Sequence, residues 1–495
     1  MTQATEPPCN DDITVRLAGP AMIGRQPSGL LRRLSDIARC RKGSAAMMFA
    51  ASSFAFLGLV GLATEAGSWY FAHRRGQNAA DAAAMAGAMT YAVRLDTDNS
   101  KTYPAVRGTA TLNGYTTGGQ ITVSPSRPPT IGAYNTDNLA VEAIIRQVQT
   151  VSFARLFDTN ATTVTTRAVA KLVAVGDACV LTLTDSLILS GNFSATAPNC
   201  MLASNKPGQN SINIGGSSTV NVNSLTAVGE CAGCYSNNVV PGVPVYAPNV
   251  PTRNPYAALD LQTWPSYTGG SECDNSKIGS GANLNGNNGN SGNPTGAYPP
   301  TYSNAGFPNT SGKAYCSQLH MQNGDNITFS PGIYVFYNAP IKIDGGSLTC
   351  IGCTNTNGVH IVQIDPSGQH DDFDINAAAT VVLSAGTTVP TVPGLTPTTA
   401  PALTGVLFYR TATSQNFNSS EITINGGATT NLAGGIYFPN ADAHYNGNNS
   451  SPCTVIVGGG ITMNGTAGLN SNLATTGCSA IGTPIPQIQS VKLVE

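Results

Sequence analysis

A continuous apolar stretch lies near the N-terminus of the chain, where 21 residues from Ser44 to Thr64 carry no formal charge. A helix of this length can cross a hydrocarbon core of about 30 Å, since it rises about 1.5 Å per residue. Because the stretch is rich in Ala, Gly and Ser, a buried helix of a soluble protein is one alternative. A cleaved signal peptide is another, but its apolar core is usually only about 7 to 15 residues long. The pattern therefore predicts an uncleaved transmembrane helix.

The residues after this span keep a helical composition. Gln77 to Val93 is dominated by Ala and Met and contains no Pro, which predicts one unbroken helix to about Arg94. Small residues recur along it, and packing against another helix or a sheet is the first interpretation of this stripe. Its members are Ala79, Ala80, Ala83, Ala84, Gly87 and Ala88.

The apolar period changes beyond the helix. Alternating apolar and polar residues at 140–151 and 161–175 predict two strands, and residues 152–158 between them read as a short helical turn. We expect residues 96–176 to form a small α+β region whose sheet packs on the extended helix.

From Ala178 onward, short β-branched runs alternate with Gly, Asn, Ser and Thr. The runs are too short for helices and suit strands. IKIDGG at 341–346 and ITINGG at 422–427 share a pattern, and G-I-Y occurs at both Gly332 and Gly435. Such loose repetition is typical of stacked coils. We therefore predict a mainly β protein in which residues 177–495 form a parallel β-helix (solenoid), with a β-sandwich or jelly roll as the alternative. Residues 269–312, almost without apolar side chains, should be a loop insertion.

The charge distribution orients the span. Seven basic residues precede it between residues 13 and 42, where the only acid is Asp36. They are Arg16, Arg25, Arg32, Arg33, Arg39, Arg41 and Lys42. Positive flanks stay in the cytoplasm, and the cations at 73–75 weaken this bias without reversing it. We expect residues 1–42 to be a mostly disordered cytoplasmic tail, residues 43–95 the transmembrane and extended helix, and the remainder to lie across the membrane.

Cysteine and charge counts agree with this topology. Ten of the twelve cysteines follow the span, as expected in an oxidising compartment. Their spacing suggests local pairs, although sequence alone does not fix the connectivity, and the two C-x-G-C pieces could instead give four thiolates to one zinc. The suggested pairs are Cys179 with Cys200, Cys231 with Cys234, Cys273 with Cys316, Cys350 with Cys353, and Cys453 with Cys478. After Leu172, seven Lys or Arg oppose fifteen Asp or Glu, which leaves no basic patch for nucleic acid.

The residues around the span resemble the N-terminal segment of TadG-like proteins of the Tad (tight adherence, Flp pilus) assembly system of bacteria. The pattern is a basic residue and Gly, an Ala-rich span, an acidic residue and Gly, an aromatic pair, a basic pair, and then Q-x-A-A-D-A-A-A-x-A-G-A. It covers about fifty residues. The positions that carry it here are Gly43, Glu65, Gly67, Trp69, Tyr70, Arg74, Arg75, Gln77, Ala80, Asp81 and Ala84.

Two departures from related proteins bear on function. Some relatives have a von Willebrand A domain with a D-x-S-x-S metal motif, whereas the nearest match here, residues 96–100 (DTDNS), has Asp at the third position. The fifth residue of a mature pilin is Glu, whereas this chain has Met47 or Met48 at the corresponding position. We expect an uncleaved anchor rather than a pilin subunit, and no metal-dependent adhesion site. Glu65 either contacts a partner or sits at the membrane interface.

Catalytic motifs are not evident in the sequence. The one dense carboxylate group, Asp371, Asp372 and Asp374 beside His370, reads as a solvated turn, with a calcium or catalytic cluster as the alternative. Lys342 and Arg410 stand alone in the sequence, and so do His320, His360 and His444.

These observations lead to one expectation of function. The resemblance implies a non-enzymatic component of Tad pilus assembly that needs no cofactor, is anchored once in the bacterial inner membrane, and acts as a periplasmic scaffold or linker. Its partners would be inner membrane lipid and other pilus-assembly or secretion proteins, with no nucleic acid. A surface adhesin on the same anchor and a β-helical carbohydrate-active enzyme are the alternatives.

Overall fold

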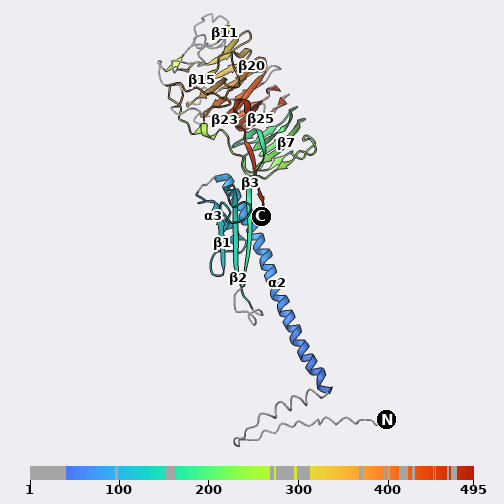
Figure 1. The fold of residues 1–495 in the computed structure, drawn as a ribbon. Helices are drawn as coiled ribbons and strands as arrows, with labels where there is room; N and C mark the ends of the chain where they lie inside the picture. Colours follow the sequence, from blue (N-terminus) through green and yellow to red (C-terminus); the bar gives the residue numbers. More distant parts are fainter. Residues whose placement is uncertain are drawn as a thin grey trace, which may run out of the picture. The chain divides into compact units, whose positions relative to one another are not determined.

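The computed structural model describes residues 41–94, 98–151, 162–267, 272–274, 295–297, 313–366, 372–394, 396–397, 402–411, 422–425, 430–446, 448–449, 451, 453–464, 468–469 and 477–495. The tail expected up to residue 40, the turn expected at 152–158 and most of the insertion expected at 269–312 lie outside these residues. The chain forms two compact units (Figure 1). The first includes the N-terminal helix up to Ala86, residues 103–169 and Glu495; the second includes residues 87–102 and 170–494.

The N-terminal helix α2 runs unbroken from Arg41–Arg94, as predicted. Within the described part of the chain, it is the helix that is long and apolar enough to cross a membrane. Large apolar side chains along its first half point outward, with Phe54 79% exposed and Leu62 60% exposed. So much exposed apolar surface is unfavourable in water, and this supports lipid as the surroundings of this half of the helix.

A small antiparallel sheet covers the later part of α2 in the first unit. Strand β1 (Ile121–Ser126) pairs with β2 (Ala140–Gln149), which pairs with β3 (Thr162–Thr182), and helix α3 spans Thr102–Leu112. Both predicted strands are present, and β3 is longer than predicted. The helix can approach the sheet because Gly76 has no side chain: a Cβ there would lie 3.1 Å from Thr166 Cγ2.

A buried carboxylate holds this sheet to the loop after β1. Glu142 is 0% exposed, and its oxygens accept hydrogen bonds from Ser126 Oγ at 2.7 Å, Thr130 N at 2.9 Å and Thr130 Oγ1 at 2.7 Å. Arg167 pairs with Glu142 and with Glu495. Burial by itself would raise the pKa of the Glu142 carboxyl, but the hydrogen bonds from Thr130, Ser126 and Arg167 outweigh it and hold the pKa below its ordinary value.

The second unit consists of parallel strands that pair in three rows. The first row is in the order β10 (Cys273–Asp274), β12 (Ala314–Tyr315), β15 (Gly332–Tyr337), β18 (Val359–Ile364), β21 (Val406–Arg410), β23 (Asn431–Tyr445), β25 (Thr454–Met463), β3, β5 (Ser194–Ser204), β7 (Thr219–Ala227) and β9 (Val245–Tyr246).

The second row contains mostly three-residue strands. Its order is β13 (Leu319–Met321), β16 (Ile341–Ile343), β19 (Phe373–Ile375), β22 (Ile422–Ile424), β23, β25, β4 (Leu187–Leu189), β6 (Ile212–Ile214) and β8 (Cys231–Ala232). The two flanking residues of each I-x-I strand are buried and the middle one is half exposed, because successive side chains of a strand point to opposite faces.

The third row is shorter. It contains β11 (Thr295–Ala297), β14 (Asn326–Phe329), β17 (Gly346–Cys350), β20 (Ala379–Ser384) and the start of β23, while β24 (Asn448–Asn449) and β26 (Gly468–Leu469) lead to the start of β5. A row of side-chain amides follows the ends of the second-row strands: Asn376 donates to Asp344 at 2.6 Å, and Asn446 donates to Asn425 at 2.8 Å.

The chain does not pass through these rows in sequence order. It starts at β3, continues to β9, and then crosses to β10 at the other end of the rows. From β10 it returns to β25, which pairs with β3 and β4 (Figure 1). Finally, η2 (Ser479–Ile481) leads to β27 (Gln487–Leu493), which is antiparallel to β3. The chain therefore enters and leaves the rows of strands at the same place, between their two ends.

The crossing segment, residues 251–267, which we call the strap, lies on buried aromatic rings. Its Tyr256 ring is 5.1 Å from the Tyr437 ring, and its Trp264 ring is 6.2 Å from the Tyr409 ring. Tyr409 Oη donates to Leu259 O at 3.1 Å, within the short helix α4 (Ala257–Asp260). The strap is thus held by both ring packing and hydrogen bonds.

The ten cysteines beyond α2 lie in five pairs at disulfide distance, with Cα atoms 4.9 to 5.8 Å apart. They are the same pairs that the spacing suggests. Each C-x-G-C piece pairs within itself, with Gly233 and Gly352 in the left-handed region at φ of 79° and 78°. The Cys231–Cys234 and Cys350–Cys353 pairs therefore close tight corners of the chain.

Replacing both Cys231 and Cys234 by Ser should lower the free energy of unfolding by about 2 kcal/mol, because only a short loop is closed by this pair. The Cys350→Ser, Cys353→Ser variant should show a similar loss, since its sequence separation is also 3. Urea unfolding of the oxidised proteins measures both. A loss above about 4 kcal/mol in either variant would mean that the pair does more than close its corner.

Candidate membrane and assembly segment

The residues that resemble a Tad segment all lie on α2, and the structure separates them into a lipid-exposed group and a packed group. Gly43 lies in the first turn of the helix. Gly67 faces open space, since a Cβ there would meet nothing within 4 Å. Tyr70 is 60% exposed, whereas Glu65 is only 7% exposed. Glu65 is therefore a covered acid within an apolar segment.

Aromatic and basic side chains follow at the outer end of the span. Trp69 is partly buried, while Arg74 and Arg75 are exposed. The Arg74 guanidinium carbon lies 5.8 Å from the centre of the Tyr70 ring, a cation–π distance. These side chains have the composition of a membrane interface, where amphipathic rings and cations are favoured.

The Q-x-A-A-D part of the motif packs the helix onto the sheet. Gln77 Nε2 donates to Asp81 Oδ1 at 2.7 Å and to Arg167 O at 2.8 Å, so one amide joins two turns of α2 to strand β3. Ala80 and Ala84 are both 0% exposed. This supports the packing interpretation of the alanine stripe and places the most recognisable part of the motif inside the first unit.

Gln77→Ala should lower the free energy of unfolding by about 1 to 2 kcal/mol, because a partly buried side chain then loses two hydrogen bonds and the Arg167 carbonyl loses its donor. Asn78→Ala is the matched control, since Asn78 is the next residue and is exposed. Thermal unfolding of the full chain in detergent measures both. Equal melting temperatures for the two variants would contradict the role assigned to Gln77.

The second unit brings together charged residues that the sequence shows as isolated. His320, Lys342 and Asp374 are in register on neighbouring strands β13, β16 and β19. Lys342 Nζ lies 2.6 Å from Asp372 Oδ2, and His320 Nε2 lies 2.7 Å from Asp344 Oδ2. Treating Lys342 as isolated was therefore wrong. His320, Lys342 and Asp374 are the middle positions of I-x-I-like strands, but the sequence does not show which of these strands pair.

The protonation of this group follows from its contacts. The hydrogen bond from His320 lowers the pKa of Asp344. Burial raises the pKa of Asp374, and the charge of Asp372 adds to the effect. His370 and Asp371, which the sequence places in the same cluster, lie outside the described residues. Since Lys342 and His320 pair with Asp372 and Asp344, the described part of the cluster is an ion-pair network on a sheet face.

The other candidate residues lie in the interior. His360 is 0% exposed, and its ring nitrogens lie 2.7 Å from Val406 O and 3.3 Å from Thr388 O. Burial lowers the pKa of its ring, although the two carbonyl contacts oppose this effect. Arg410 is 3% exposed in strand β21, opposite Gln363 of β18. Among the described residues, no group of three or more His, Cys, Asp or Glu side chains is placed to hold a metal ion.

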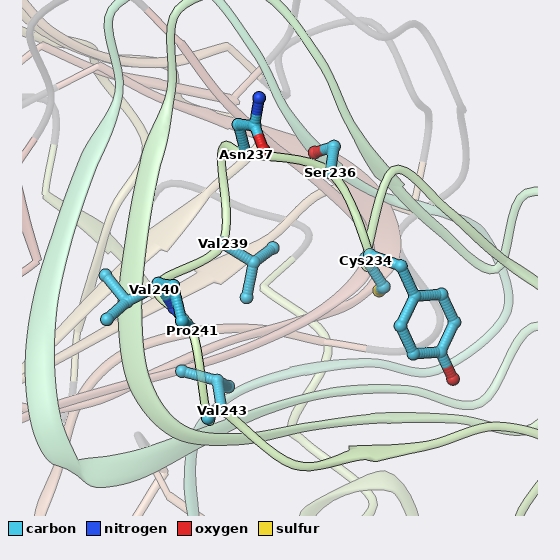
Figure 2. A pocket seen from close by; sticks show the side chains of 9 residues that line it. Cys234, Ser236, Asn237, Val239, Val240, Pro241 and Val243 are labelled. Atoms are coloured by element: carbon cyan, nitrogen blue, oxygen red, sulfur yellow. The ribbon is translucent and has the colours of Figure 1, made fainter.

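An open hollow lies at the β8–β9 end of the second unit. Residues 234–237 and 239–243 line it. Figure 2 shows Val240, Pro241 and Val243 on one side and Cys234 and Ser236 on the other, with Val239 between them. Residues 231–252 contain no Lys, Arg, His, Asp or Glu. The hollow thus offers apolar and hydroxyl groups but no acid–base pair.

Comparison with known proteins gave one match. Residues 43–90 match the sequence model of the family described as "Putative Flp pilus-assembly TadE/G-like". No curated protein and no solved structure matched the chain. The match and the apolar helix indicate a membrane anchor that crosses the bilayer once. The N-terminal segment is therefore similar to the TadE/G-like family, and this similarity supports a role in Flp pilus assembly.

Proposed function

We propose that this protein is a non-enzymatic scaffold or linker of the Flp pilus assembly machine. Helix α2 holds it in the bacterial inner membrane with the N-terminus in the cytoplasm, and both folded units lie in the periplasm. The observation that carries the proposal is the TadE/G-like match at residues 43–90, which covers the span and the part of α2 that packs on β3. The excess of basic residues before the span supports the orientation.

We propose further that the second unit winds as a parallel β-helix. Three rows of parallel strands in register, buried I-x-I side chains and the row of hydrogen-bonded Asn side chains support this. Such a stack is elongated and rigid, and it presents long polar faces on which other proteins can dock. These properties suit a spacer or platform better than a catalyst.

A non-enzymatic role also agrees with the state of the charged cluster. A glycosidase needs an acid and a base that face a substrate without permanent partners. Here Asp372 pairs with Lys342, and Asp344 pairs with His320. These contacts support a structural role for the network.

Site-specific photo-crosslinking in cells tests the function. A photoreactive residue at Asn78, which is exposed on α2 beside the first unit, should capture other pilus-assembly or secretion proteins. A probe at Ala80, which is 0% exposed, is the matched control and should capture none. Recovery of only unrelated envelope proteins from the Asn78 probe would refute the proposed role.

Protease accessibility tests the topology separately. Protease added to spheroplasts should digest the chain beyond Arg94 and leave the N-terminal segment protected. Protection of the second unit until the membrane is dissolved would refute the periplasmic placement.

A further inference from the structure

We propose that the outer end of the α2 span carries a two-tier collar that binds the phosphate groups of anionic phospholipids. The collar consists of Trp69, Tyr70 and Phe71, followed four residues later by His73, Arg74 and Arg75. This inference rests on the proposed membrane span and adds a lipid partner to it.

Helix geometry gives the collar its shape. Residues four apart lie on the same side of a helix and about 6 Å apart along its axis, and neighbouring residues are about 100° apart around it. Three consecutive aromatic residues therefore form one tier, and the three basic residues form a second tier directly beyond it. Together the pairs cover about 200° of the circumference, so the collar extends a little more than halfway around the helix, with Trp69 on its partly buried side.

Five of the six side chains of the collar are exposed, and Trp69 is partly buried. Tyr70 is 60% and Phe71 is 68% exposed, and His73, Arg74 and Arg75 are exposed as well. Within the described part of the chain, none of the three basic residues makes a salt bridge. Arg74 instead lies over the Tyr70 ring at 5.8 Å, which links the two tiers.

Directly beyond the collar, α2 packs on the sheet of the first unit. Gly76, the next residue, is buried against Thr166 of β3, and Gln77 is bonded to Arg167 O. The basic tier is therefore the last part of α2 that can face the membrane before the sheet covers the helix. Phosphate contacts at this level would fix the depth of the helix and the height of the first unit above the bilayer.

The position of these cations also needs an explanation. Basic residues at the outer end of a span oppose the positive-inside bias. Contacts with negative phosphates at that surface compensate for this, because juxtamembrane basic residues are attracted to anionic lipid. The aromatic tier suits the adjoining interface, where Trp and Tyr rings are enriched.

Energy transfer from Trp69 to labelled lipid tests the proposal. The chain has two tryptophans, so Trp264→Phe leaves Trp69 as the only donor. The full chain is placed in bilayers containing either phosphatidylglycerol or phosphatidylcholine with the same acyl-chain acceptor. We expect several-fold enrichment of phosphatidylglycerol around the helix at low salt. Each basic residue near an anionic surface contributes about 1 kcal/mol, which corresponds to a preference of about fivefold.

Paired charge variants complete the experiment. Arg74→Gln with Arg75→Gln should bring the enrichment close to one. Arg94→Gln with Arg107→Gln removes the same charge from exposed positions outside the collar and should leave it unchanged. Equal transfer to the two lipids in the parent chain, or the same enrichment in the Arg74 and Arg75 variant, would overturn the collar alone. Absence of transfer to either lipid would overturn the membrane span itself.

Discussion

Replacing Glu142 by Gln is expected to lower the free energy of unfolding of the first unit by about 3 to 5 kcal/mol. The substitution keeps the shape of the side chain but removes the negative charge that pairs with Arg167. It also places an amide where Ser126 and Thr130 both donate hydrogen bonds. Chemical denaturation of the full chain in detergent, followed by circular dichroism, measures the change.

Ser124→Ala is the control, because it alters a neighbouring position of β1 without touching this network, and it should change stability by less than about 1 kcal/mol. A Glu142→Gln protein as stable as the parent would show that the buried carboxylate does not hold the sheet together.

The same carboxylate predicts how the first unit responds to acid. The pKa of Glu142 is lower in the folded chain than its ordinary value of 4.5. The unfolded state therefore binds a proton first as pH falls, so the stabilisation by Glu142 is complete above about pH 5 and is lost as pH falls through the folded-state pKa. The difference in stability between the parent and Glu142→Gln should shrink below pH 4.5. A difference that stays constant from pH 7 to pH 3 would contradict this assignment.

Tyr437→Ala should cost about 3 to 5 kcal/mol and release the strap. The ring is 0% exposed and stacks on Tyr409 at 5.6 Å and on Tyr256 at 5.1 Å, and its hydroxyl bonds with Asn254 at 2.7 Å. Limited trypsin digestion with mass spectrometry should then show early cleavage after Arg253, which lies in the strap. Thermal unfolding measures the loss of stability.

Two further variants separate the ring from its hydroxyl and from general effects. Tyr437→Phe keeps the packing and should cost only about 1 kcal/mol. Tyr235→Ala removes a ring that is 82% exposed and should leave the melting temperature nearly unchanged. If Arg253 stays protected in Tyr437→Ala, the strap is held by contacts other than this ring.

The local structure was readable from the sequence because it depends on neighbouring residues. The I-x-I runs around Lys342 and Thr423 alternate between buried and half-exposed positions, and the structure has strands there. Gly346 follows the first of these strands with φ of 81°, as a glycine corner requires. The unbroken helix to Arg94 followed from the absence of Pro and the many alanines.

The order of the strands was not readable in the same way. The runs are alike, so a strand pattern predicts that a segment pairs but does not say with which partner. Nothing local shows that β25 pairs with β3, whose residues come more than 270 positions earlier. The position of the strap could not be predicted either, because Tyr256 and Tyr437 come into contact only when the rows of strands are assembled.

In the candidate site, too, the local features were predictable from the sequence and the long-range contacts were not. The motif on α2 was recognisable because it is continuous in sequence, whereas the role of Gln77 depends on Arg167, which is 90 residues away. The pair formed by Lys342 and Asp372 escaped notice for the same reason, since only the pairing of β16 with β19 brings the two residues together. The sequence therefore shows the motif, but the contacts that its residues make depend on parts of the chain that are distant in sequence.

Because the second unit begins at β3 and finishes at β25 and β27, which both pair with β3, the outermost strands β9 and β10 lie away from the point where the chain enters the unit. Strands could be gained or lost at either extremity during evolution without changing the pairing of β3 with β25 and β27. Such a design would let the size of the second unit vary while the strands at its entry and exit stay paired.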